Sequence, residues 1–152
     1  MPESIARFLA GRRLAVAGVS RSGRLPANAI YRKLRGSGYE VFPINPHAAQ
    51  VEGSVCYESV VALPPSVDGL IIATPPAVSA EVVRQAAACG IGRVWLHRAL
   101  GTGSVSEDAT RACRERGVEC IAGGCPLMYC EPVDLFHRCL RWWCGRRRTV
   151  PR

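Results

Sequence analysis

The chain has 152 residues, of which 48% are hydrophobic, and its formal net charge is +8. This length suits one domain with a core of its own, so the fold requires neither a disulfide framework nor a metal staple. No apolar run approaches the roughly 18 residues of a membrane-spanning helix, and residues 1–4 lack the basic-then-apolar pattern of a secretion signal, so we expect a cytoplasmic protein.

Short apolar segments alternate with amphipathic ones along the chain. The first strand is expected over residues 14–18, which are apolar on both faces, as a central parallel strand is. The other strands are expected at residues 40–44, 69–73, 93–97 and 118–122. The helices are expected at residues 4–10 (with Ser4 as the cap), 26–34, 78–89, 106–116 (with Ser106 as the cap) and 132–144. This alternation predicts a single three-layer α/β domain around a mostly parallel five-stranded sheet.

Apolar residues at helical spacing give the expected core faces of the later helices. In the 78–89 helix these are Val78, Val82, Ala86 and Cys89, and in the 132–144 helix they are Phe136, Cys139, Leu140, Trp143 and Cys144. Trp142 falls off the second stripe and is therefore available to a partner chain, either a second copy or another protein. Gly145 is expected to end this helix, so that the domain covers residues 1–145 and a basic tail covers residues 146–152.

Eight cysteines raise the question of disulfides or a metal site. None of them forms a CxxC pair, and several fall on expected apolar faces, where a free cysteine behaves as a small hydrophobe. Cys120, Cys125 and Cys130 are evenly spaced, but zinc sites usually use shorter ligand spacings. We therefore expect reduced thiols and no metal.

A glycine- and arginine-rich loop follows the first expected strand. Its sequence over residues 16–24 is VAGVSRSGR, and Pro26 then suits the first turn of a helix. A helix N-terminus leaves backbone N–H groups unpaired and carries partial positive charge, so anions bind there. The candidate phosphate-binding residues are Gly18, Ser20, Arg21, Ser22, Gly23 and Arg24. The alternative is a tight strand-to-helix turn that holds no ligand.

More loops are expected at the same edge of the sheet, because the carboxyl ends of parallel strands meet there. The second strand ends in Asn45 and Pro46, where enzymes that use NAD usually carry an acidic residue for the ribose. An uncharged turn tolerates a phosphorylated ribose better than a carboxylate would. Thr74, Pro75 and Pro76 follow the third strand and can form an apolar wall for an adenine or a pantetheine arm, and we expect them also to start a helix with Thr74 as its cap.

Five stretches together carry a resemblance to a known family. They are VAGVSRSGR at residues 16–24, VFPINP at 41–46, ATPP at 73–76, VWL at 94–96 and GCPLM at 124–128. The chain resembles the small CoA-binding domain family, whose Rossmann-like members are similar to the CoA-binding domain of the succinyl-CoA synthetase alpha subunit. The resemblance covers about residues 10–130 and implies CoA or acyl-CoA bound along the carboxyl edge of the sheet, with residues 18–24 near its phosphates. The chain departs from the family at His97-Arg98, where an uncharged residue and a proline are common, and residues after Asp134 are not covered.

Two side chains at this edge are candidates for chemistry. His97 ends the fourth strand and is counted among the candidate ligand-binding residues, although no acid partner or nucleophile accompanies it. A low-pKa thiol at Cys125 could form a mixed disulfide with CoA or accept an acyl group, whereas the simpler interpretation is a buried loop cysteine. The resemblance implies that related ligases use a phosphorylated histidine from a second domain, which we do not expect in this chain. We therefore expect no catalysis by the chain itself.

The expected function is that of a non-catalytic CoA- or acyl-CoA-binding protein. One alternative is an NAD(P)-dependent oxidoreductase, which the uncharged turn at Asn45 disfavours. Another is an adaptor that contacts nucleic acid or an anionic membrane surface through the arginine-rich C-terminus. A solvated helix face and tail explain those arginines without a partner, so we do not expect nucleic acid to bind.

Overall fold

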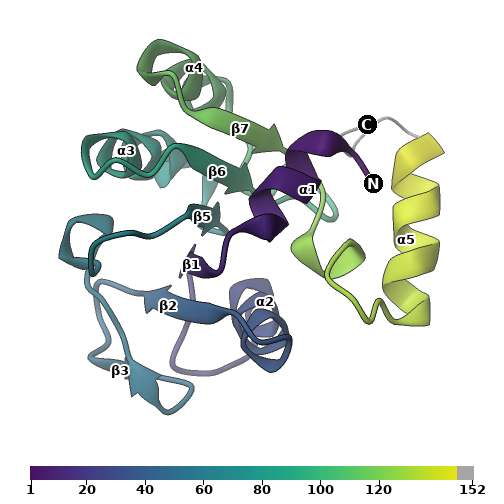
Figure 1. The fold of residues 1–152 in the computed structure, drawn as a ribbon, viewed down its shortest axis with the longest axis horizontal. Helices are drawn as coiled ribbons and strands as arrows, with labels where there is room; N and C mark the ends of the chain where they lie inside the picture. Colours follow the sequence, from purple (N-terminus) through teal and green to yellow (C-terminus); the bar gives the residue numbers. More distant parts are fainter. Residues whose placement is uncertain (147–152) are drawn as a thin grey trace.

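A parallel sheet with helices on both faces forms the body of the molecule (Figure 1). The computed structural model describes residues 1–146. Within that range the main sheet has five strands, all parallel, in the order β2-β1-β5-β6-β7. They are β1 (Arg13–Ala17), β2 (Glu40–Ile44), β5 (Gly69–Ile72), β6 (Arg93–Leu96) and β7 (Glu119–Ala122). The predicted single α/β domain is confirmed.

The helices form the two outer layers. On one face of the sheet lie α3 (Pro76–Ala88) and α4 (Glu107–Arg116), and on the other side lie α1 (Glu3–Ala10), α2 (Pro26–Gly36) and α5 (Leu135–Arg146) (Figure 1). Shorter elements complete the described chain: a hairpin of β3 (Gln50–Val51) and β4 (Ser54–Val55), and the 3-10 turns η1 (Val60–Ala62) and η2 (Pro126–Met128).

Side-chain alternation along the strands divides the core between the two faces. In β1, Leu14 and Val16 pack toward α1 and α2, whereas Ala15 and Ala17 pack toward α3 and α4. Trp95 of β6 is fully buried on the α1 side, and its indole N–H donates to the Gly123 carbonyl at 2.9 Å. Because β1 buries residues on both faces, its apolar sequence predicted a central strand correctly, and β5 and β6 are buried on both faces as well.

Pro43 lies inside β2 without a lost ladder bond. Its carbonyl accepts from the Tyr57 N–H at 2.9 Å, on the side of β2 that faces away from β1. Since the nitrogen and carbonyl of one strand residue point the same way, the missing N–H also faces this outer edge, where proline is tolerated.

The predicted core face of α3 is confirmed at Ala86 and wrong at Val78, Val82 and Cys89. The buried residues are Ser79, Ala80, Val83 and Ala86, while Val78 is 47% exposed. Small side chains on this face let α3 lie close to the sheet and to α4. This closer packing is favoured over burial of the larger Val78 and Val82. Val78 and Val82 are thereby turned toward the carboxyl edge of the sheet.

The termini differ from prediction as well. The helix α1 begins at Glu3 after Pro2, so Ser4 is not its cap. The last helix begins at Leu135 and continues through Gly145, and of its predicted stripe only Cys144 is buried. Leu140 is partly buried against the core, and the other three residues of the stripe point outward because α5 contacts the body mainly through η2. Arg146 is the last residue of α5, and residues 147–152 of the predicted tail lie outside the described residues.

Candidate functional site

The direction in which strands are added to the sheet reverses at β1. The chain therefore leaves β1 and β5 toward opposite faces of the sheet, to α2 and α3. The chain runs from β1 outward to β2 and then returns to β5 on the other side of β1. In open parallel sheets, ligands bind outside the carboxyl ends of the strands at such a point. Gly18 has φ +101°, and a Cβ on it would lie 2.5 Å from the Ala73 carbonyl oxygen, so glycine allows the loops after β1 and β5 to touch.

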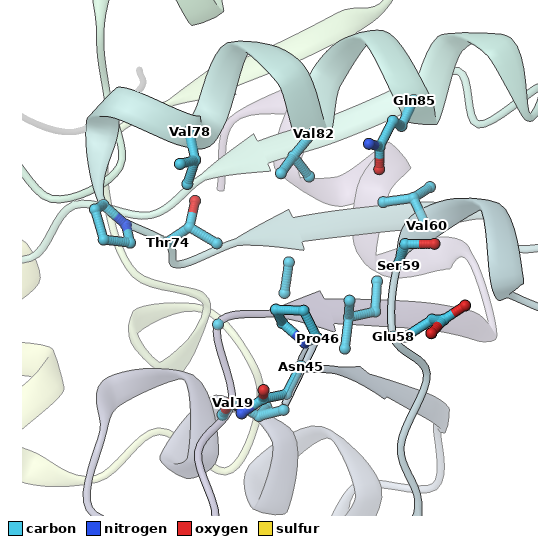
Figure 2. A pocket seen from close by; sticks show the side chains of 14 residues that line it. Val19, Asn45, Pro46, Glu58, Ser59, Val60, Thr74, Val78, Val82 and Gln85 are labelled. Atoms are coloured by element: carbon cyan, nitrogen blue, oxygen red, sulfur yellow. Dashed lines mark hydrogen bonds between the residues drawn. The ribbon is translucent and has the colours of Figure 1, made fainter. Parts of the chain in front are cut away.

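A cavity of about 390 Å³ opens at this point, between the ends of β1, β2 and β5 and the helix α3 (Figure 2). Five of the residues predicted for the site line it: Gly18, Asn45, Pro46, Thr74 and Pro75. The other predicted residues do not line it: Ser20, Arg21, Ser22, Gly23, Arg24, Pro76 and His97. The structure therefore brings the ends of β1, β2 and β5 to one cavity and leaves the arginine-rich part of the loop beside it.

Sequence reasoning missed a second group of lining residues: Glu58, Ser59, Val60, Val78, Val82 and Gln85. Figure 2 shows Val78, Val82 and Gln85 extending from α3 toward Pro46 on the opposite wall. Their spacing of four and three residues is the signal that could have found them, because it places them on one face of the helix. The segment at Glu58 gives no such signal, since it lies in a short irregular stretch between β4 and η1.

Asn45 is a positioning residue in this arrangement. Its side-chain N–H donates to the Val19 carbonyl at 2.8 Å, and its side-chain oxygen accepts from the His47 N–H at 2.7 Å. The amide thus joins the loop after β1 to the turn after β2. Both ends of Asn45 are occupied by the protein, so its contribution is to hold the cavity floor in place.

The loop after β1 is held by a buried network that the sequence analysis did not predict. Asn28, which is fully buried, accepts from the Ser20 N–H at 2.9 Å and donates to the Ser20 carbonyl at 2.8 Å. It also donates to the Glu52 carboxylate at 3.0 Å, and Arg32 pairs with the same carboxylate at 2.6 Å. Arg32 donates to the Gly23 carbonyl at 3.1 Å. The hairpin β3–β4 therefore fixes both ends of residues 20–23.

Positive charge is exposed beside the cavity. Arg21 and Arg24 are both exposed, and within residues 1–146 neither guanidinium pairs with a carboxylate. The N-terminus of α2 has no side-chain cap and no acidic residue in its first turn. The loop therefore offers cationic groups and uncapped amides to an anion.

Thr74 does not cap α3, which corrects one of the two roles expected of it. The cap position is Pro75, and no side chain bonds to the first turn. The Thr74 hydroxyl lies 3.3 Å from the Ser79 hydroxyl, and its carbonyl accepts from the Ser104 hydroxyl at 2.6 Å. Ser104 thus ties the loop after β6 to the loop after β5.

His97 lies at the predicted edge but is 7% exposed, and it does not line the cavity. Its backbone N–H donates to the Ile72 carbonyl at 2.9 Å, and its carbonyl accepts from the Ser104 N–H at 2.8 Å. Its Nε2 has no hydrogen-bond partner among the described residues. Burial lowers the pKa of His97, so the imidazole is held in its neutral form.

Cys125 shows no sign of activation. Cys125 is 3% exposed, and burial raises its pKa to about 12. This contradicts the low-pKa interpretation of Cys125 and agrees with a buried loop cysteine. No disulfide joins the cysteines, and no group of three or more histidine, cysteine or acidic residues suited to a metal ion occurs between residues 1 and 146.

Known proteins match this geometry over most of the chain. A family model described as a CoA binding domain matches residues 12–131. The ADP-forming acetate–CoA ligase II of Archaeoglobus fulgidus is 35% identical over 80 residues, which are 51% of this chain and 12% of the ligase. The chain thus spans about an eighth of that relative's length.

Two solved structures share the fold. A hypothetical protein from Pyrococcus horikoshii OT3 aligns with a TM-score of 0.75 and 28% identity, over 82% of this chain and 85% of that one. The dinucleotide-forming acetyl-coenzyme A synthetase 1 of Ca. Korarchaeum cryptofilum, solved with phosphate and ADP, aligns with a TM-score of 0.64 and 25% identity, over 76% of this chain and 26% of that one. By its fold and its matched sequence, the chain belongs to the CoA-binding domain family and is similar to the CoA-binding domains of acyl-CoA ligases.

Proposed function

We propose that the chain binds CoA or acyl-CoA at the carboxyl edge of its sheet and catalyses no reaction by itself. The observation that carries this proposal is the cavity at the switch point between β1 and β5, in a chain of the CoA-binding domain family. Its volume of about 390 Å³ lies within the range of small-molecule pockets. An adenosine moiety fits that size, and the rest of CoA would extend along the neighbouring loops.

The cavity walls suit an adenine ring. Val60, Val78 and Val82 supply apolar surface for its faces, and Ser59 and Gln85 supply polar groups that can hydrogen-bond to its edge. The combination of apolar walls with few polar groups is typical of pockets for planar heterocycles.

The phosphates would lie over residues 20–24. Arg21 and Arg24 are exposed there, and one guanidinium group can donate two parallel hydrogen bonds to the oxygens of one phosphate. The network of Asn28 and Glu52 holds the loop in one shape before a ligand arrives, which reduces the entropy lost on binding.

The absence of catalysis is supported by the state of the two candidate groups. His97 is buried away from the cavity with a lowered pKa, and Cys125 is buried with a raised pKa. Neither group is placed to act on a ligand that occupies the cavity. A ligase reaction would require domains beyond this one, and the likeness to the acetate–CoA ligase makes service as the CoA-binding part of such an assembly a second candidate.

One observation favours a further candidate, a dinucleotide of the NAD type. Glu58 lines the cavity beside Pro46, so a carboxylate is present even though the turn after β2 is uncharged. A carboxylate near this point can bind ribose hydroxyls. CoA remains the preferred ligand because the family match extends over residues 12–131.

A thermal-shift titration with CoA, acetyl-CoA, NADH and NADPH separates these candidates. A ligand that binds only the native state raises the melting temperature with concentration. We expect CoA or acetyl-CoA to raise the melting temperature of the wild type and to raise that of Arg24→Gln by less. Arg116→Gln is the control, because it removes an exposed arginine at the end of α4, and its shift should equal that of the wild type. A larger shift with NADPH than with CoA would refute the proposal.

A further inference from the structure

The helix α5 has two apolar faces, and only one is covered by the described residues. Its inner face turns Cys144 and Leu140 toward the core of the α1 side. Its outer face, defined here as Leu135, Phe136, Cys139, Trp142 and Trp143, is directed to solvent. The exposed fractions of its four large side chains are 74%, 67%, 61% and 40% for Leu135, Phe136, Trp142 and Trp143. A helix that is apolar on both sides is normally covered on both.

The position of α5 leaves this outer face accessible. Figure 1 shows α5 (yellow) at one side of the molecule, beside η2 and away from α3 and α4. A hollow of about 710 Å³ lies over it, bounded by Arg138 and Arg141 together with residues of the outer face. Exposed apolar surface gathered in one place marks an interaction site rather than ordinary scatter.

The charges within α5 have one sign, and the carboxylate that precedes the helix, Asp134, is paired with His137. Residues 135–146 contain Arg138, Arg141 and Arg146 and no acidic side chain, and two more arginines follow directly in the sequence. The Arg146 guanidinium lies 4.2 Å from the centre of the Trp142 ring. Arg141 donates to the Met128 carbonyl at 3.2 Å, which holds its charge at the border of the helix and the body. The outer face is therefore an apolar strip bordered by cations.

We propose that the outer face of α5 docks on an anionic lipid bilayer, with the helix lying in the membrane interface. Tryptophan, phenylalanine and leucine on one face, flanked by arginines, are the residues that place a helix in that plane. The arginines complement the negative surface potential of an anionic leaflet. None of the helices within the described range is long and apolar enough to span a bilayer, so α5 would lie on the membrane rather than cross it.

Charge and polarity argue against two other occupants. A second copy would bring its own Arg138, Arg141 and Arg146 against these three without any carboxylate on the same helix. Nucleic acid would satisfy the arginines but would leave Leu135 and Phe136 without an apolar partner. An anionic bilayer satisfies both the cations and the apolar strip.

Cosedimentation with phosphatidylcholine vesicles, with and without phosphatidylserine, tests the proposal. We expect binding that requires phosphatidylserine and weakens with added salt. Trp95 is fully buried, so a blue shift of tryptophan emission on binding reports Trp142 and Trp143. Bilayer lipids with brominated chains should quench that emission.

Paired variants place the contact on α5. Arg138→Gln should weaken binding about fivefold, and Trp142→Ser should weaken it about tenfold or more, because its large exposed surface no longer leaves water. Arg116→Gln and Val61→Ser, which remove an exposed cation and an exposed apolar side chain elsewhere, should bind as the wild type does. All four positions are at the surface, so the melting temperature should not change.

Several results would overturn the proposal. One is a lack of binding to phosphatidylserine vesicles, and another is equal binding by all four variants. A dimer that forms in the absence of lipid and is lost in Trp142→Ser would assign the outer face to a second copy. Binding to a polynucleotide but not to vesicles would assign it to nucleic acid. None of these results depends on CoA binding, so the test is independent of the proposed function.

Discussion

Replacement of Asn28 by alanine tests the network that holds the loop after β1. The side chain is fully buried and makes two hydrogen bonds with the backbone of Ser20 and one with the carboxylate of Glu52. A neutral hydrogen bond contributes about 1 kcal/mol net, and one to a charged group about 1.5–3 kcal/mol. Because Ser20 is partly exposed and water can replace some of these bonds, we expect Asn28→Ala to lower the free energy of unfolding by about 3 kcal/mol.

Urea unfolding followed by circular dichroism measures this change as a lower midpoint at an unchanged slope. For a chain of this size the melting temperature should fall by about 6–12 °C. Ser22→Ala is the matched control, because it removes only two exposed contacts, one of 2.7 Å between the Ser20 and Ser22 hydroxyls and one of 3.5 Å from the Arg24 N–H. We expect it to change stability by less than about 0.5 kcal/mol.

A second prediction, separate from stability, concerns ligand binding by the loop after β1. Asn28→Ala should also weaken CoA binding, since the loop then samples more conformations before the ligand arrives. Gln85→Ala, at the cavity wall, should weaken binding while stability stays near that of the wild type. A change in stability below about 1 kcal/mol in Asn28→Ala would refute the claim that this network fixes the loop.

Three further expectations follow from the same structure. Gly18→Ala should destabilise by about 2 kcal/mol or more, because its Cβ would meet backbone at 2.5 Å at a φ of +101°, while Gly36→Ala, with open space around it, should stabilise slightly in the same urea series. His97 has a lowered pKa in the folded state, so protonation favours unfolding. Its contribution to stability is complete above the unfolded pKa of about 6.5 and falls as the pH drops below it. In thermal melts between about pH 7.5 and 5.5, His97→Gln should make the melting temperature depend less on pH. Cys125 should resist iodoacetamide in the native protein while the exposed Cys139 reacts, as peptide mass mapping can record; early labelling of Cys125 would contradict its raised pKa.

Local sequence signals were sufficient for the sheet and for much of its carboxyl edge. The apolar runs at β1, β5 and β6 predicted strands, and the run at β1 predicted a central one because both of its faces are buried. The predicted cap of α4 is confirmed, since the Ser106 hydroxyl accepts from the Ala109 N–H at 3.0 Å. The meeting of Gly18 with the loop at Thr74 also followed from the expected parallel sheet, because parallel strands end at one edge.

The sequence did not predict which face of a helix is buried where two neighbouring faces are similarly apolar, because tertiary packing decides between them. In α3, valines and small residues offer two neighbouring faces, and the choice of Ala80 and Val83 for the core leaves Val78 and Val82 to line the cavity. In α5, both faces are apolar, so periodicity alone could not tell which one is covered.

The network at the loop after β1 was missed for a different reason. Asn28 and Glu52 are separated by 24 positions and come from different elements. Nothing in the local pattern around Glu52 indicates that its hairpin folds back over the loop. Such contacts become visible only once the hairpin β3–β4 is placed against α2.

Titration calorimetry of CoA into the wild type and into Val82→Trp tests the central claim most directly. Val82 lines the cavity of about 390 Å³ and is only partly buried, so a tryptophan there should fill much of the space without disturbing the core. We predict saturable binding at one site in the wild type and its loss in Val82→Trp, at a similar melting temperature. Equal CoA binding by the two proteins, or none by the wild type, would contradict the account.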